Sequence, residues 1–372
     1  MKQWSRIIPF KSQNSRMETW IYDDSDIKKR YEVDVTLGKP IDITALKLNE
    51  LENFHAQVVA TRDSRTNLFQ SVNMREVTLC PICQRKTDKN IPPIFEVYTA
   101  HYVQCPSCLH CYVATVPSDE SLHRFYASNK EYQKIYTDKR TADIRVQQVA
   151  LPKAEWAIHQ YYKLYGKKPH SVLDVGAGSG HFVQACRSLG LKADGVEISE
   201  SGREFCKTYF GFELANCDFT REWQRFKDYD MVTFWAVIEH VSNPMAMLAA
   251  GSKIVFGKEG LVVADVPRWD SFSTAVQNQF SNSVIRHLDP LGHINCFTDS
   301  SLATAYVLNN LDIVSAWYFG MDAYELVTQL SHALPDGKII ETLKSSIPAF
   351  QKSIDLAILS DEMVFAGKPS SL

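Results

Sequence analysis

From residue 171 onward, short apolar runs alternate with segments that have the periodicity of amphipathic helices. The runs that read as strands are SVLDV, KADGVEIS, YDMVTFW, LVVADVP and, at the end of the chain, MVFAGKP. Gly190 directly after one helical segment and Pro244 at the start of another are typical helix boundaries. Short buried strands alternating with helices indicate a mostly parallel sheet covered by helices on both faces. We therefore expect a doubly wound α/β domain over residues 169–372.

The N-terminal half has a different organisation. Residues 1–75 are polar and mixed; Tyr31 to Val35 alternates like a short strand, and the stretch from Ile43 to Val72 resembles a broken amphipathic helix. An accessory packing or oligomer-forming extension is the simplest interpretation. Residues 76–115 are rich in cysteine, and residues 116–168 have the pattern of a helical bridge.

The composition excludes several classes of protein. Of the 372 residues 45% are hydrophobic and 22% charged, which is typical of a globular chain, and the net charge of -3 gives no general attraction to nucleic acid. No apolar run is long enough to span a bilayer, and the first residues lack the apolar core of a signal peptide. A cytoplasmic location without membrane insertion is the expectation.

A glycine-rich loop follows the first strand of the α/β segment. It contains Gly176, Gly178 and Gly180, and Asp174 stands two positions before the first glycine. Glycines let a loop turn sharply and bring its backbone close to a ligand. A carboxylate at the position of Asp174 would repel the pyrophosphate of a dinucleotide. It suits a ligand with an ammonium and a sulfonium, as in S-adenosyl-L-methionine (SAM).

Two further acidic residues follow at successive strand ends, where doubly wound folds bind ligands. Glu197, after the second strand, is expected to bind the ribose hydroxyls. Asp218 follows the expected third strand, which lies between KADGVEIS and YDMVTFW; it is expected to bind the adenine amino group, with Phe219 covering the ring. Trp235 ends the fourth strand and is expected beside the methionine part of SAM. A nicotinamide cofactor would also use an acid after the second strand, but it has no use for Asp174.

The cysteine-rich unit contains two C-x2-C pairs separated by 21 residues. This spacing is typical of a zinc ribbon, in which four thiolates close a structural Zn²⁺ site and leave no open position for catalysis. The predicted ligands are Cys80, Cys83, Cys105 and Cys108. His110 and Cys111 lie next to the last ligand, and their part in metal binding stays open.

These motifs resemble those of class I SAM-dependent methyltransferases. LDVGAGSG, GVEIS, CDF and YDMVTFWAVIEHVSNP are similar to that family's successive motifs. The resemblance implies a Rossmann-like sheet of seven strands, the last one antiparallel. The run HYVQCPSCLHCYVATVPSDESLHRFY also resembles the zinc ribbon of bacterial methyltransferases that act on nucleotide-linked sugars or on surface glycans such as O-antigen and capsule. It departs from their pattern at Leu109-His110, where a glycine is usual.

The resemblance implies SAM-dependent methyl transfer to a sugar acceptor, either a nucleotide-linked precursor or a glycan in polysaccharide biosynthesis. One alternative is a base methyltransferase of ribosomal or transfer RNA whose ribbon grips nucleic acid, although clustered basic residues are scarce there. Another alternative is a module that binds SAM, or a partner, without turnover.

The insert after the fifth strand, residues 268–298, is the natural lid over the acceptor. It carries His293 and His287, which we expect to act as the general base, and Asp289, which can orient one of them. His240, in a stretch common to many such enzymes, is interpreted as packing against the cofactor loop.

Overall fold

A computed structural model gives the structure of this chain. It describes residues 4–7, 14–24, 27–39, 63, 73–88, 91–98, 100–128, 137–279, 288–290, 292–334, 342–343 and 345–370. The helix expected between residues 43 and 72 lies outside the described residues, as does His287.

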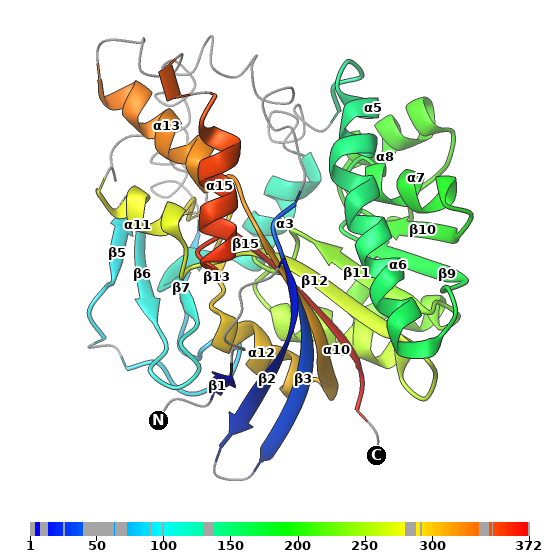
Figure 1. The fold of residues 1–372 in the computed structure, drawn as a ribbon, viewed down its shortest axis with the longest axis horizontal. Helices are drawn as coiled ribbons and strands as arrows, with labels where there is room; N and C mark the ends of the chain where they lie inside the picture. Colours follow the sequence, from blue (N-terminus) through cyan, green and yellow to red (C-terminus); the bar gives the residue numbers. More distant parts are fainter. Residues whose placement is uncertain are drawn as a thin grey trace.

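The described residues form one main sheet of nine strands (Figure 1). In spatial order these are β1 (Trp4–Ile7), β2 (Ser15–Asp23), β3 (Lys28–Leu37), β14 (Leu311–Phe319), β15 (Glu362–Pro369), β12 (Leu261–Pro267), β11 (Met231–Trp235), β9 (Ser171–Val175) and β10 (Lys192–Val196). Strands β10, β9, β11 and β12 run parallel to one another, whereas β15 is antiparallel to both β12 and β14. The expected mostly parallel, Rossmann-like α/β fold and its antiparallel last strand are confirmed.

Both edges of this sheet differ from the expected seven strands. At one edge β3 pairs in parallel with β14, and β2 and β1 follow it. The alternating Tyr31, Val33 and Val35 are buried in β3, so the N-terminal extension contributes core as well as strands. At the other edge, beyond β10, a single bridge between Val196 and Ala215 stands where a further strand was expected.

Helices cover both faces because alternate strand residues point to opposite sides. Val172 and Val263 pack in the core beneath α6 (Leu151–Tyr165) and α7 (His181–Ser188), whereas their neighbours Leu173 and Val262 belong to the core beneath α10 (Pro244–Val255) and α12 (Asp299–Leu308). The start of α10 follows the sequence expectation: Pro244 is its first residue, and the Asn243 side chain accepts a hydrogen bond from Ala246 N at 2.9 Å.

The remaining helices lie around this frame. They are α3 (Asp119–Ser128), α5 (Ala142–Arg145), α8 (Glu200–Phe205), α9 (Phe219–Glu222), α11 (Phe272–Gln279), α13 (Asp322–Ala333) and α15 (Ile347–Leu356). Among the residues described, no helix combines the length and apolar character needed to cross a membrane.

The cysteine-rich unit forms two smaller sheets. One is the pair β4 (Met74–Glu76) and β8 (Thr115–Pro117). The other has four strands in the order β13 (Asn295–Cys296), β7 (Cys111–Val113), β6 (Ala100–Gln104) and β5 (Phe95–Val97). β13 comes from the lid insert, and Figure 1 shows the strands β5 to β7 next to α11 of the same insert.

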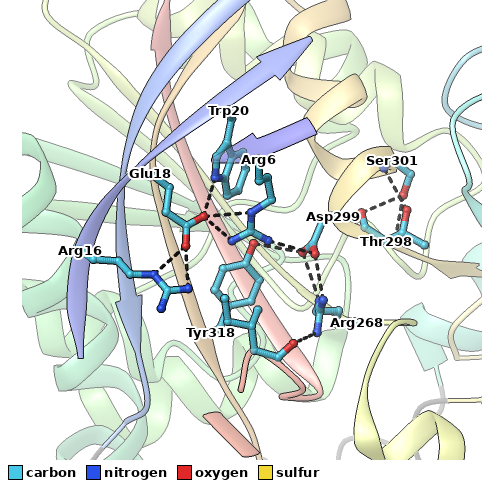
Figure 2. A network of polar contacts seen from close by, with 10 residues as sticks. Arg6, Arg16, Glu18, Trp20, Arg268, Thr298, Asp299, Ser301 and Tyr318 are labelled. Carbon is cyan, nitrogen blue, oxygen red and sulfur yellow. Dashed lines mark hydrogen bonds and ion pairs between the residues drawn. The ribbon is translucent and has the colours of Figure 1, made fainter. Parts of the chain in front are cut away.

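A polar network closes the base of the lid insert (Figure 2). Arg268, its first residue, donates two hydrogen bonds to Asp299, which follows its last residue, at 3.1 and 2.9 Å. Arg6 from β1 reaches the same carboxylate at 3.4 Å and also donates to the buried Glu18 of β2. The N-terminal strands and both ends of the insert are therefore joined by one set of charged contacts.

Candidate functional site

The glycine loop lies between β9 and α7. Gly176, Gly178 and Gly180 all have positive φ angles, of 74°, 54° and 81°, which favour glycine. A Cβ atom on Gly176 would come within 2.5 Å of the Val237 side chain, whereas one on Gly178 would meet no atom within 4 Å. The loop is therefore packed against the segment after β11 on one side and has room for a ligand at Gly178.

Glu197 holds this loop in place. It follows the last residue of β10 and is 7% exposed. One carboxylate oxygen accepts a hydrogen bond from Gly178 N at 2.7 Å, and the other accepts one from Ser199 N at 2.6 Å. Burial raises the pKa of Glu197 above its ordinary value. The structure thus brings this residue directly to the glycine loop.

Asp174 is buried one position before the end of β9. Its carboxylate accepts a hydrogen bond from the Thr233 hydroxyl at 2.8 Å, and burial raises its pKa to about 7. A carboxylate taken out of water is costly unless a positive charge compensates it. The ammonium of an amino-acid moiety would supply such a charge.

Trp235 ends β11 and lines the same edge of the sheet. Its ring packs against Phe182 at a centroid distance of 5.1 Å, and Lys153 Nζ lies 4.8 Å from its centroid. Lys153 forms a buried ion pair with Asp265 at the end of β12. The strand end beside the glycine loop therefore combines an aromatic wall with paired charges.

Several buried polar atoms around this edge have no hydrogen-bond partner among the described residues. They are Ser179 Oγ, His181 Nε2, Trp235 Nε1 and both carboxylate oxygens of Glu239. Buried polar groups in folded proteins are nearly always paired, so unpaired ones gathered at one edge suggest that a ligand completes them. The residues present fit SAM, which carries cationic and hydrogen-bonding groups.

Asp218 and Phe219, the predicted contacts of the adenine, each have contacts within the chain. The Asp218 side chain accepts hydrogen bonds from the backbone N and hydroxyl of Thr220 and so caps α9. Phe219 is 4% exposed and packs edge-on against Phe234 in the hydrophobic core. Their binding of adenine stays a prediction.

The lid insert brings His293 beside His240, which follows β11. Their ring centroids are 5.0 Å apart. His240 Nδ1 donates to Gly292 O at 2.5 Å, and its Nε2 lies 3.4 Å from Glu239 Oε1. Burial lowers the pKa of His240 to about 4 and raises that of the fully buried Glu239. His240 is therefore a neutral imidazole whose Nε2 faces a carboxyl group.

Sequence reasoning named His293 as a base and interpreted His240 as packing against the cofactor loop, but it assigned no role to Glu239, whose signal is its place after the fourth strand. It also did not assign a role to Tyr126 of α3, whose hydroxyl lies 3.2 Å from His240 Nδ1. Asp289 contacts His293 through its backbone carbonyl, which accepts a hydrogen bond from His293 N at 2.7 Å.

Within the part of the chain that the structure describes, two groups of side chains could hold a metal ion. The first is the set of four cysteines, whose sulfur atoms lie within 4.8 Å of one another, with 3.5 Å between Cys80 and Cys108 and 3.6 Å between Cys83 and Cys105. A tetrahedral site with Zn–S bonds of about 2.3 Å separates its sulfurs by about 3.8 Å, so the geometry fits zinc. The second group is Glu239, His240 and His293, whose donor atoms also lie within 4.8 Å of one another.

The two residues left open next to the cysteines have other contacts. The imidazole of His110 lies 3.1 Å from Asn295 Oδ1 and 3.3 Å from Ser301 Oγ. The Cys111 sulfur lies near Gln104 and the Leu109 carbonyl. Neither residue belongs to the four-sulfur group.

Comparison with known proteins gives a family match. Residues 152–316 match a family described as a methyltransferase domain. The chain is 26% identical over 167 residues to the ubiquinone biosynthesis O-methyltransferase of Thiobacillus denitrificans, covering 43% of this chain and 61% of that protein. It is 32% identical over 99 residues to the enzyme of the same name from Coxiella burnetii, covering 24% of this chain and 40% of that protein. The chain thus spans less than two thirds of these curated relatives.

Among solved structures, a SAM-dependent methyltransferase from Archaeoglobus fulgidus aligns with a TM-score of 0.39 and 17% identity, covering 62% of this chain and 100% of that one. The strand order described above is that of a Rossmann-like fold, and residues 152–316 within it match the family of methyltransferase domains.

Proposed function

We propose that this protein transfers the methyl group of SAM to a hydroxyl group of a small-molecule acceptor. The observation that carries the proposal is the cluster of Glu239, His240 and His293 beside the glycine loop. Val237, in the same segment as His240, is the side chain that packs against Gly176. A neutral imidazole at this place can take the proton that a hydroxyl group loses on methylation.

The cofactor would be held by Asp174, Glu197 and the backbone of the glycine loop. When bound, SAM supplies a methyl group activated by its sulfonium. Glu197 already fixes Gly178, so the loop is preorganised, and rearrangement on binding is small. The Asp174 carboxyl offers its negative charge to the cofactor's ammonium, and Trp235 and Phe182 exclude water from one side of the site.

We assign the general base to His293. Asp289 fixes the turn that presents it, through the hydrogen bond from His293 N. His240 lies alongside, with Nδ1 donating to Gly292 O and Nε2 facing Glu239. Alignment of acceptor and methyl group contributes several kcal/mol, and a placed base adds about 10²–10⁴-fold.

The acceptor class that we propose is a sugar, nucleotide-linked or within a glycan. The resemblance of the cysteine-rich unit to the ribbon of sugar methyltransferases supports it. The names of the curated relatives, ubiquinone biosynthesis O-methyltransferases, support small-molecule O-methylation and make a quinol the competing acceptor. The net charge of -3 disfavours RNA.

The cysteine-rich unit would hold one structural Zn²⁺ through Cys80, Cys83, Cys105 and Cys108. Three of these cysteines are buried and the fourth, Cys83, is partly exposed. Four sulfur ligands complete a tetrahedral shell, so this ion would take no part in the methyl transfer itself.

The test is methyl transfer from radiolabelled SAM to a panel of nucleotide-linked sugars, catechol-type quinol analogues and transfer RNA. Methylation of a sugar hydroxyl is the expected result. His293→Gln should retain affinity for S-adenosylhomocysteine (SAH) while kcat falls about a hundredfold, as for a lost general base. His159→Gln, on the exposed side of α6, is the matched control and should keep wild-type turnover.

The outcomes separate the parts of the proposal. Methylation of catechols alone would refute the sugar acceptor and leave O-methylation standing. Methylation of transfer RNA alone would overturn the small-molecule proposal. Wild-type turnover in His293→Gln would remove the general base.

A further inference from the structure

The cysteine-rich unit and the lid insert are built on the same sheet. β7 pairs antiparallel with β13, with Tyr112 opposite Asn295 and Cys111 opposite Cys296. Val113 N also donates to Ile294 O at 3.0 Å. The segment that carries His293 is thus the edge strand of the cysteine-rich unit and the turn before it.

His110 connects a cysteine pair to this segment. Its backbone carbonyl accepts a hydrogen bond from Cys105 N at 2.8 Å, so it belongs to the turn that presents two of the four sulfurs. Its fully buried ring lies 3.1 Å from Asn295 Oδ1 and stands edge-on to Phe297 at 4.8 Å between centroids. The His110 side chain therefore connects the turn that carries Cys105 and Cys108 to β13.

Asn295 in turn forms hydrogen bonds with the loop that contains His240. Its Nδ2 donates to Val241 O at 2.8 Å, and its backbone N donates to Glu239 O at 3.1 Å. These two carbonyls flank His240 in the chain. Because the amide NH₂ faces carbonyl oxygens, Oδ1 faces His110, and the proton of that imidazole sits on Nε2.

Tyr102 reaches the other histidine of the site. It lies on β6, is fully buried, and its hydroxyl donates to the backbone carbonyl of His293 at 3.1 Å. The backbone at His293 is therefore held directly by Tyr102 of the cysteine-rich unit. The backbone next to His240 is held by Asn295, which in turn contacts His110 of that unit.

We propose that the cysteine-rich unit is a positioning part of the acceptor site, in which Tyr102 and His110 set the placement of His293 and His240. The catalytic meaning of this placement rests on the proposed methyl transfer. Tyr102 contacts the backbone carbonyl of His293, and His110 contacts the side chain of Asn295, so both act on the site as positioning residues.

A matched pair of single-oxygen deletions tests the proposal. Tyr102→Phe removes the hydroxyl that holds His293. Tyr112→Phe removes a hydroxyl on the neighbouring β7, which lies 2.6 Å from Thr87 within the cysteine-rich unit. Both variants keep the ring in a buried position. Each protein would be used as the full chain, zinc-loaded and saturated with SAH.

Two readouts need no acceptor. The first is amide hydrogen exchange of a peptide covering residues 288–297, and the second is the imidazole NMR signal of His293, assigned with His293→Gln. Loss of one buried hydrogen bond corresponds to about a two- to tenfold change in an opening equilibrium. Tyr102→Phe should speed exchange of the peptide by this factor and shift the His293 signal, whereas Tyr112→Phe should do neither.

A second pair of variants tests the His110 arm. His110→Leu should shift the imidazole signal of His240, and His110→Gln, which can still donate to Asn295, should restore it. Equal effects of the two tyrosine variants, or an unchanged lid peptide in Tyr102→Phe, would overturn the proposal. Failure of the wild type to bind SAH would instead refute the proposed function, so the two failures are distinguishable.

Discussion

Three acidic residues at the carboxyl end of the parallel strands are buried in the ligand-free protein. Asp174, Glu197 and Glu239 are each at most 7% exposed, and burial raises the pKa of all three. Such carboxyl groups oppose folding when they ionise and favour binding when a positive charge arrives. These three carboxyl groups therefore lower the free energy of unfolding of the ligand-free protein and raise its affinity for a cationic ligand.

Asp174→Asn should weaken SAH binding strongly and stabilise the ligand-free protein at pH 8. The folded-state pKa of Asp174 is raised from 3.8 to about 7. The folded protein therefore binds this proton more tightly than the unfolded chain does, and the residue's contribution to the free energy of unfolding falls as the pH rises from about 4 to about 7. Calorimetric titration and thermal melts measure both effects, and the melting temperature should rise by about 2 °C or more.

Glu200→Gln, an exposed acid on α8, is the control and should change neither quantity. An Asp174→Asn variant with wild-type SAH affinity would contradict the assigned role of this carboxyl group.

Roles that depend on local spacing could be predicted from the sequence at this scale. Asp174 stands two residues before the glycine loop, and Glu197, 19 residues after Gly178, contacts the loop through a hydrogen bond to Gly178 N; their binding of SAM stays a prediction. Asp218 also caps the short helix α9, and Phe219 is buried in the core, which the sequence pattern did not predict. Whether a side chain at this point caps a helix or enters the core depends on tertiary packing, which a local sequence pattern does not predict.

At the scale of the elements, the cysteine-rich unit brings four sulfur atoms together in the geometry of a zinc site. Cys83→Ser should abolish stoichiometric zinc and lower the melting temperature, because a structural zinc site contributes directly to folding. Cys111→Ser alters a buried cysteine outside the four-sulfur group and should retain one zinc per chain. Elemental analysis of protein purified without chelator checks both variants, and equal zinc in the two would refute the assigned ligands.

Pairing between elements was the part that sequence patterns could not supply. The alternation of Tyr31 to Val35 predicted a strand, and β3 confirms it, but its neighbour β14 lies more than 270 residues further along the chain. β13 has only two residues, which is too short for any periodicity. Sheet partners so distant in sequence are fixed by the completed fold.

At the scale of the whole molecule, the polar network in Figure 2 joins the first strands to the base of the lid insert. Asp299 is its centre and accepts hydrogen bonds from Arg268, Arg6 and the Tyr318 hydroxyl. Burial alone would raise the pKa of Asp299, but the two guanidinium groups hold it below its ordinary value. Its stabilising effect is therefore present at neutral pH and is lost as the pH falls below the usual aspartate range.

Asp299→Asn should lower the free energy of unfolding at pH 7 by about 2–3 kcal/mol, because Arg268 then loses a charged partner in a largely buried setting. The difference from wild type should shrink below about pH 4. Urea unfolding followed by circular dichroism measures it. Glu120→Gln, which breaks an exposed pair with Arg124 on α3, should cost less than about 0.5 kcal/mol. Equal urea midpoints for Asp299→Asn and wild type would show that the network carries no stability.

The nine-stranded sheet also limits how this chain can be divided. The segment that matches the methyltransferase family, residues 152–316, contains β12 and part of β14 but not β15, the strand between them, nor β3 on the far side of β14. Expressed alone, it would leave apolar strands with open hydrogen-bonding edges, which invite pairing between molecules and aggregation. Recombinant work on the matched segment thus needs the strands β1 to β3, within residues 4–37, and β15, residues 362–369, as well, even though neither end belongs to that segment.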